Sequence, residues 1–194
     1  MQSFKKFLEK YTTIPKEDWE MIRDSFVRKE FAKDELILSE GMICKHFYFL
    51  EEGLVRFFIH HDGEDLTTFF VDAPYCFTAK DSFHDRVPAR ENIQTLAPCV
   101  VWQTTLEKIS ILSGLKSWEQ FTRSFIHEVQ GYIEHLMITN KILSAEERYV
   151  KLLELHPDLT QRIPLKYLAG FLGIAPQSLS RIRKKFQKKF ADLT

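Results

Sequence analysis

The stretch from Leu165 to Arg183 reads LKYLAGFLGIAPQSLSRIR and contains two short amphipathic segments joined at a glycine. Ala169 supplies a small side chain where two helices would cross, and Gly173 supplies a turn residue that adopts positive φ easily. The apolar positions fall on the faces that two such helices would share: Leu168, Leu172, Ile174, Leu179 and Ile182. The pattern predicts a helix-turn-helix whose second helix begins at Pro176, and it favours DNA binding over an inert helical hairpin.

The second of these helices would present polar and basic side chains on its remaining surface. Gln177 and Ser178 lie in its first turn, where this motif reaches base edges, and Arg181 follows one turn later. An arginine there could pair with guanine, and Gln177 could pair with adenine. Phosphate contacts are expected from Ser180, Arg183, Lys184, Lys185 and Lys188. The alternative for such a basic run is a solvated helix face.

Charge is divided unevenly along the chain, although the formal net charge is zero. Residues 146–194 hold ten Lys or Arg against five Asp or Glu, which gives +5, and residues 1–145 hold the balancing −5. The run from Arg181 to Lys189 contains no acidic residue. This surplus indicates double-stranded DNA as the partner of the C-terminal part.

The region from Phe31 to about Thr105 has short runs rich in Phe, Val, Ile and Thr, separated by turn residues at intervals of roughly ten. Its clearest feature is a pair of runs, Leu54–His60 and Leu66–Val71, around the hairpin signal Asp62–Gly63. The pattern predicts an antiparallel barrel or jelly roll.

Helical periodicity flanks this β region. Residues 1 to about 28 predict two short helices broken near Pro15, and residues 118–143 predict a helix that spans about 38 Å. The long helix could be an ordinary core helix, but its place before a DNA-binding element favours pairing with a second copy in a homodimer. The fold class is therefore α+β. We expect a β-roll with leading helices in residues 1–116, a dimerisation helix in 117–143 and a helix-turn-helix domain in 144–194.

The chain has no run of about 18 apolar residues and no signal-peptide core at its start, so we expect a cytoplasmic protein that does not contact a membrane. Its three cysteines show no CxxC spacing, which favours buried free thiols: Cys44, Cys76 and Cys99.

A metal-dependent barrel enzyme is an alternative of a different class, because four histidines lie in the β region: His46, His60, His61 and His84. Adjacent strand residues point to opposite faces, so His60 and His61 cannot share one barrel interior. No His-x-His pair or regularly spaced carboxylate completes a site. We expect no metal, no cofactor and no catalytic residue. A ligand-binding sensor with weak or no DNA binding remains a second alternative.

The chain resembles the cyclic-AMP receptor protein (Crp/Fnr) family of bacterial transcription regulators. The resemblance is carried by YFLEEGLVRF at Tyr48–Phe57, by Gly63–Glu64, by SAEERY at Ser144–Tyr149 and by Leu168–Arg183. It implies a cyclic-nucleotide-binding-like β-roll, a dimer helix and a DNA-binding domain that reads a palindromic operator, with RNA polymerase as a further partner. It also implies that Arg181 occupies the base-contacting arginine position of the family.

The nucleotide contacts of the family are degenerate in this chain. Nucleotide-binding members carry a Gly-Glu pair for the ribose and an Arg-Ser/Thr pair for the cyclic phosphate. Aligned through Ile93–Leu96, these pairs fall near Thr78–Ala79 and Ala89–Arg90, so the Glu is absent, and Glu91 partly cancels the field of Arg90. We therefore expect no tight binding of cyclic AMP. The iron–sulfur cluster of oxygen-sensing members is disfavoured too, because no cysteine precedes Cys44.

An unknown small-molecule effector, if there is one, is expected in the β-roll cavity. The candidate residues are Arg56, Phe70, Ser82, Phe83 and Arg90. In the predicted helix-turn-helix, Ala175 stands where a Ser or Thr often caps the recognition helix.

Overall fold

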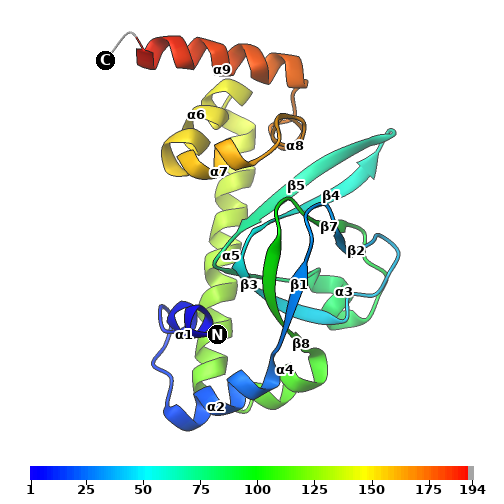
Figure 1. Ribbon diagram of the computed structural model, residues 1–194, viewed down its shortest axis with the longest axis vertical. Helices are drawn as coiled ribbons and strands as arrows, with labels where there is room; N and C mark the ends of the chain where they lie inside the picture. Colours follow the sequence, from blue (N-terminus) through cyan, green and yellow to red (C-terminus); the bar gives the residue numbers. More distant parts are fainter. Residues whose placement is uncertain (192–194) are drawn as a thin grey trace.

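The computed structural model describes the backbone of residues 1–191 and the side chains of residues 1–186. Two antiparallel sheets face each other and form the β-roll, with strand orders β1-β8-β3-β6 and β2-β7-β4-β5 (Figure 1). The strands are β1 Val27–Phe31, β2 Leu36–Leu38, β3 His46–Glu52, β4 Leu54–His61, β5 Glu64–Asp72, β6 Tyr75–Phe77, β7 Asn92–Thr95 and β8 Cys99–Thr105. This arrangement confirms the predicted α+β class with a jelly-roll-like domain.

The helices pack around this roll and continue beyond it. They are α1 Gln2–Leu8, α2 Lys16–Ser25, α3 Lys80–Asp85, α4 Leu106–Leu112, α5 Lys116–Ile142, α6 Ala145–Leu155, α7 Pro157–Arg162, α8 Leu165–Phe171 and α9 Pro176–Ala191. The two leading helices, the long helix and the final pair agree with the sequence prediction to within a few residues. Helices α3, α4 and α7 were not predicted, since each is only one or two turns long. The domain boundaries at residues 116 and 143 stay predictions.

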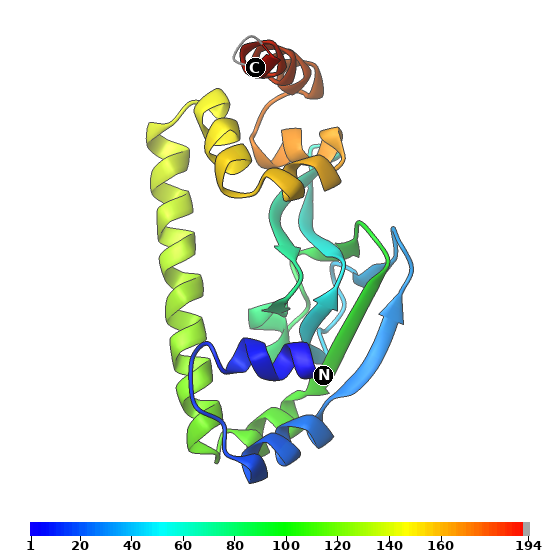
Figure 2. The ribbon, with the colours of Figure 1, turned by 60° about the vertical axis from the view of Figure 1, so that its left-hand side comes forward.

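The hairpin of β4 and β5 forms where the sequence places Asp62 and Gly63. Both loop residues have positive φ, 51° and 78°, as a two-residue turn of the mirror-image type requires. Figure 2 shows the two strands rising from the roll towards the C-terminal helices. The hairpin therefore has one face in the roll and an outer face near the C-terminal helices.

Alternation along β4 separates two sets of buried side chains. Val55 and Phe57 belong to the core inside the roll, where Phe57 lies edge-on to Phe77 with ring centroids 6.1 Å apart. Leu54 instead belongs to the core shared with the C-terminal helices. Because both faces of β4 are covered, the strand is buried from Leu54 to Phe58.

An aromatic cluster joins α1, α2 and β3 to the first half of α5. Phe7 contacts Phe49 on β3 and both Phe121 and Phe125 on α5, with ring centroids 5.5, 6.2 and 5.9 Å apart. Trp118 is 1% exposed within the same cluster. This packing fixes the first half of the 27-residue helix α5 on the roll, and its second half continues along the molecule to α6 (Figure 2).

A buried arginine connects the outer face of the hairpin to α8. The Arg56 side chain is 2% exposed, and its guanidinium carbon lies 3.9 Å from the ring centroid of Phe58 and 3.7 Å from that of Tyr167. Its Nη2 donates to Asp65 Oδ2 at 2.8 Å, and its Nε donates to Gln94 Oε1 at 2.9 Å. Burial raises the pKa of Asp65, but the hydrogen bond and charge of Arg56 outweigh it, and the pKa is lowered overall. The cation is thus paired with a carboxylate and stacked between two rings.

Further contacts hold the C-terminal helices on this sheet. Phe70 on β5 meets Phe171 on α8 with ring centroids 5.4 Å apart, and Arg162 on α7 pairs with Asp72 at 2.7 Å. Gly170 of α8 lies directly over β5, since a Cβ there would make ordinary van der Waals contact with the carbonyl oxygen of Asp65 at 3.6 Å. These contacts set the position of the C-terminal helices relative to the roll.

We predict that Tyr167→Leu lowers the free energy of unfolding by about 1–2 kcal/mol, because it removes an aromatic face from a desolvated cation. Tyr167→Phe is the matched control, since it keeps the ring and removes only the hydroxyl. Urea unfolding of both variants is the measurement. Equal losses in the two variants would contradict the stacking account.

Candidate nucleic-acid interface

The helix-turn-helix has the turn that its sequence predicts. Gly173 has φ of 67°, and its N–H donates to the carbonyl of Gly170 at 3.0 Å. The N–H of Ile174 donates to the carbonyl of Ala169 at 3.0 Å, so both carbonyls near the end of α8 are satisfied. Ala169 is fully buried, as the crossing point of the two helices requires.

The predicted packing residues form one core. Leu168, Leu172 and Leu179 are buried, and Ile174 and Ile182 pack against them. Tyr149 from α6 and Ile163 from the segment before α8 complete the cluster. The same cluster includes Leu54 and Leu96 of the roll, so the helix-turn-helix shares its core with the β domain.

Helix α9 begins at Pro176 without a side-chain hydroxyl in front of it. The carbonyl of Ala175 accepts from the N–H groups of Ser178 and Leu179 at 3.0 and 3.2 Å. Pro176 suits the first helical position because its missing N–H would have no partner within the helix. The N–H of Gln177 is therefore the one donor in this first turn without a backbone partner among the described residues, and it lies at the start of α9, where the helix dipole favours negative charge.

One face of α9 is exposed and cationic. Gln177, Arg181 and Lys184 follow one another at steps of four and three, so they lie above one another on the helix, and all three are exposed. Within the part of the chain whose side chains are described, no group makes a hydrogen bond or ion pair with any of the three. Ser178 and Ser180 are half-buried beside this face.

Two of the expected phosphate contacts are directed elsewhere. Arg183 donates from Nη2 to the carbonyl of Thr160 at 3.0 Å, and its guanidinium lies 5.9 Å from the ring centroid of Tyr149. Lys185 pairs with Glu146 on α6 at 2.5 Å. Both side chains therefore hold α9 against α6 and α7, which differs from our expectation. Lys188, the remaining expected contact, lies outside the residues whose side chains the structure describes.

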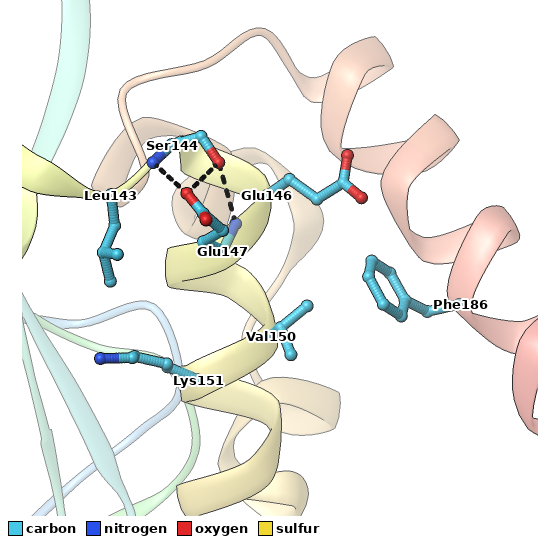
Figure 3. A pocket seen from close by; sticks show the side chains of 7 residues that line it. All are labelled: Leu143, Ser144, Glu146, Glu147, Val150, Lys151 and Phe186. Atoms are coloured by element: carbon cyan, nitrogen blue, oxygen red, sulfur yellow. Dashed lines mark hydrogen bonds between the residues drawn. The ribbon is translucent and has the colours of Figure 1, made fainter.

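A hollow of about 550 Å³ separates α6 from the second half of α9. Figure 3 shows Glu146 reaching from α6 towards α9, with Phe186 facing it from α9. Glu147 lies on the same side and closes the capping box with Ser144, whose hydroxyl accepts from the Glu147 N–H at 3.3 Å. Glu146 and Glu147 line this hollow together with Lys151, and Glu146 is paired with Lys185, so the hollow has no surplus of positive charge to attract a phosphate backbone. The cationic side of the helix-turn-helix is the face of α9 that carries Arg181.

The five residues proposed for an effector pocket do not meet in one cavity. Arg56 and Phe70 lie on the outer side of the hairpin and contact α8, as described above. Phe83 lies in the core of the roll, and the Ser82 hydroxyl accepts from the backbone N–H of Cys44 at 2.8 Å. Arg90 is exposed. Strand alternation is the reason, because Arg56 sits between Val55 and Phe57, which point inwards.

The surroundings of Arg90 are more acidic than an anion site requires. Burial, together with the charge of Asp81, raises the pKa of the neighbouring Glu91. The position expected for the family glutamate is Ala79, which is 2% exposed and precedes α3. The interior of the roll is occupied by stacked rings, including Tyr48 and Phe77 at 4.9 Å between centroids.

The histidines of the β region are dispersed. His60 pairs with Asp65, His61 with Asp62 and His84 with Asp85, all at exposed positions. No group of three or more His, Cys, Asp or Glu suited to a metal ion occurs among the described residues. The three cysteines are buried and free. Across the described residues, no helix has the length and apolar character needed to cross a membrane.

Arg148 is a structural residue of this element that sequence reasoning did not identify. Its Nη1 donates to the carbonyls of Asn140 and Leu143 at 3.2 Å each, and its Nη2 donates to the carbonyl of Leu172 at 2.7 Å. It therefore ties the end of α5 to the end of α8. Its position in the SAEERY stretch, one residue after the capping-box glutamate, was the available signal.

Comparison with known proteins supports this architecture. The model of the cyclic nucleotide-binding domain family matches residues 28–112. A search of curated proteins gives no significant match.

Several solved structures are similar over most of the chain. A mutant of CooA from Carboxydothermus hydrogenoformans has a TM-score of 0.70 at 13% identity, covering 87% of this chain and 79% of that one. FixK2 from Bradyrhizobium japonicum has a TM-score of 0.70 at 18% identity, covering 84% and 85%. A putative transcriptional regulator of the Crp/Fnr family from Eubacterium rectale has a TM-score of 0.70 at 16% identity, covering 91% and 85%. Residues 28–112 thus match the cyclic nucleotide-binding domain family, and the chain as a whole has the fold seen in solved structures of Crp/Fnr regulators.

Proposed function

We propose that this protein is a DNA-binding transcription regulator that acts as a homodimer on a palindromic operator in the cytoplasm. The observation that carries the proposal is the exposed, unpaired face of α9 formed by Gln177, Arg181 and Lys184. It is not proposed to be an enzyme, and RNA polymerase is a further partner that the family resemblance suggests.

The geometry of α9 suits the major groove. The groove admits one α-helix, and the motif reads bases from the first turns of its second helix. Arg181 is free to pair with a guanine because no described side chain engages it, and Gln177 precedes it by one turn. Lys184 continues the same face towards phosphates. Arg183 and Lys185 would position α9, and the side chains on its outer face would contact the bases.

The second half of α5 supports dimer formation. Ile126, Ile133 and Met137 are 63%, 46% and 57% exposed and follow one another at steps of seven and four, so they lie on one side of the helix. This side is turned away from Tyr132, which meets Phe69 of the roll with ring centroids 5.5 Å apart. A parallel pair of α5 helices would cover the stripe and bring two copies of α9 to one end of the dimer.

Regulation by cyclic AMP is not part of the proposal. The two nucleotide-binding pairs of the family fall on Thr78–Ala79 and Ala89–Arg90, and Glu91 and Asp81 add negative charge beside Arg90. The alternative function is a small-ligand sensor with weak or no DNA binding. The experiment on Arg181 below separates the two.

We predict that Arg181→Ala weakens binding to DNA fragments selected with the wild-type protein by about tenfold or more, as expected for loss of an arginine–guanine pair. Lys184→Gln should weaken binding to all fragments similarly and reduce the salt dependence by about one counterion. Mobility shift over a range of salt concentrations is the measurement, with Lys141→Gln on α5 as the control. A protein that gives no salt-sensitive shift would support the sensor alternative instead.

We predict that Ile133→Glu converts the dimer to a monomer, because it places a charge in the apolar stripe of α5. Ile111→Glu is the control, since Ile111 is 64% exposed on α4, away from that stripe. Analytical ultracentrifugation gives the mass of each variant. A wild-type chain that sediments as a monomer at high micromolar concentration would refute this arrangement.

We predict that isothermal titration calorimetry detects no tight binding of cyclic AMP to the purified protein, because the ribose-binding carboxylate is absent and acidic groups flank Arg90. Sub-micromolar affinity would show that the roll keeps a nucleotide site.

A further inference from the structure

A small cavity lies where the end of α5 meets α6 and α8, well away from the DNA-facing side of α9. Its volume is about 100 Å³, which equals the share of roughly three water molecules in the liquid. Leu136 from α5, Leu152 from α6 and Phe171 from α8 form its apolar wall. The site is therefore large enough for a small organic molecule with a short apolar body.

The polar groups around this cavity are basic or neutral. Lys151 and Arg148 line it together with His135 and His156, and none of the described lining residues is Asp or Glu. Neither Arg148 nor Lys151 makes an ion pair within 4 Å among the described side chains. The Nε of Arg148 is buried without a hydrogen-bond partner. Such an excess of donors over acceptors favours an anion.

The helix ends at the cavity reduce the positive potential of Arg148 and Lys151 without cancelling it. Arg148 donates hydrogen bonds to carbonyls at the C-terminal ends of α5 and α8. Each of these helix ends is equivalent to about half a negative charge. The end of α5 is followed directly by the start of α6 at Ala145, whose opposite partial charge offsets it. Hydrogen bonds from Ser144, with the charge of Lys151, lower the pKa of Glu147, so Lys151 is partly compensated as well. A surplus of about one positive charge remains, which suits a monoanion rather than a polyphosphate.

We propose that this cavity binds a small monocarboxylate with a short aliphatic body. The carboxylate lies at the mouth beside Lys151, where His135 and His156 offer ring N–H groups, and the aliphatic body packs against Leu136, Leu152 and Phe171. The ligand would touch α5, α6 and α8 at once, so it would fix the angle between the long helix and the DNA-binding element. The proposal that the ligand binds depends on the cavity alone. Only the effect of the ligand on DNA binding rests on the proposed function.

The test is a titration of the full-length, 15N-labelled protein with sodium butyrate at constant ionic strength, followed by backbone amide NMR without DNA. We expect saturable shifts confined to residues 132–156 and 171–172. Butylamine, which has the same body and the opposite charge, should give no such shifts. Equal responses to the two compounds, or shifts that do not saturate, would overturn the proposal.

Two variants identify the site. Lys151→Gln should weaken butyrate binding by about threefold to fivefold, as for a partly exposed ion pair, whereas Lys141→Gln on the neighbouring surface of α5 should leave it unchanged. Leu152→Phe should abolish binding by filling the cavity, and its thermal unfolding shows whether the fold is kept. Unchanged binding in Lys151→Gln would exclude this cavity as the site. Because no DNA is present, a failure of this experiment is distinct from a failure of DNA binding.

Discussion

The stack of Arg56 between Phe58 and Tyr167 joins the β4–β5 hairpin to the helix-turn-helix. A guanidinium that is 2% exposed would be costly if it lacked partners, and here it has two rings, the carboxylate of Asp65 and the amide of Gln94. Phe58, Asp65 and Gln94 belong to the roll, and Tyr167 belongs to α8, so Tyr167 is the partner through which this cation joins the two parts of the chain. The position of α9 depends on this contact and on the Phe70–Phe171 pair beside it.

The basic residues of helix α9 fall into two groups, one that contacts α6 and α7 and one that lies on the open face. Arg183 and Lys185 turn towards α6 and α7, where a carbonyl and a carboxylate receive them, and Arg181 and Lys184 remain on the open face. Leu179 is fully buried and Arg183 is half-buried, so these two residues fix the rotation of the helix about its axis, and this rotation leaves Arg181 and Lys184 on the open face. The lysine and arginine content of the sequence alone does not distinguish these two groups, because the residues of both groups lie in one continuous basic run.

The sequence alone was sufficient to predict the features that depend only on local residue chemistry and spacing. The Asp62–Gly63 hairpin, the Gly173 turn and the long helix follow from short-range rules, and all three are observed. The effector-pocket residues were misplaced because their environment depends on which elements pack outside the roll. Arg56 pairs with Asp65 across the hairpin but stacks on a ring more than one hundred residues later. Arg183 and Arg148 show the same difficulty, since their partners are carbonyls that no sequence motif marks.

The most direct test of the proposed regulator is selection of bound fragments from a genomic library with the full-length protein. The account predicts enrichment of a palindrome whose half-sites are centred about one helical turn, or ~10 base pairs, apart, as two α9 helices of a dimer would require. Selection with Arg181→Ala should lose the enrichment at one base position in each half-site. A library that returns no common sequence, or the same sequence with and without Arg181, would contradict the assignment of α9 as the helix that reads DNA.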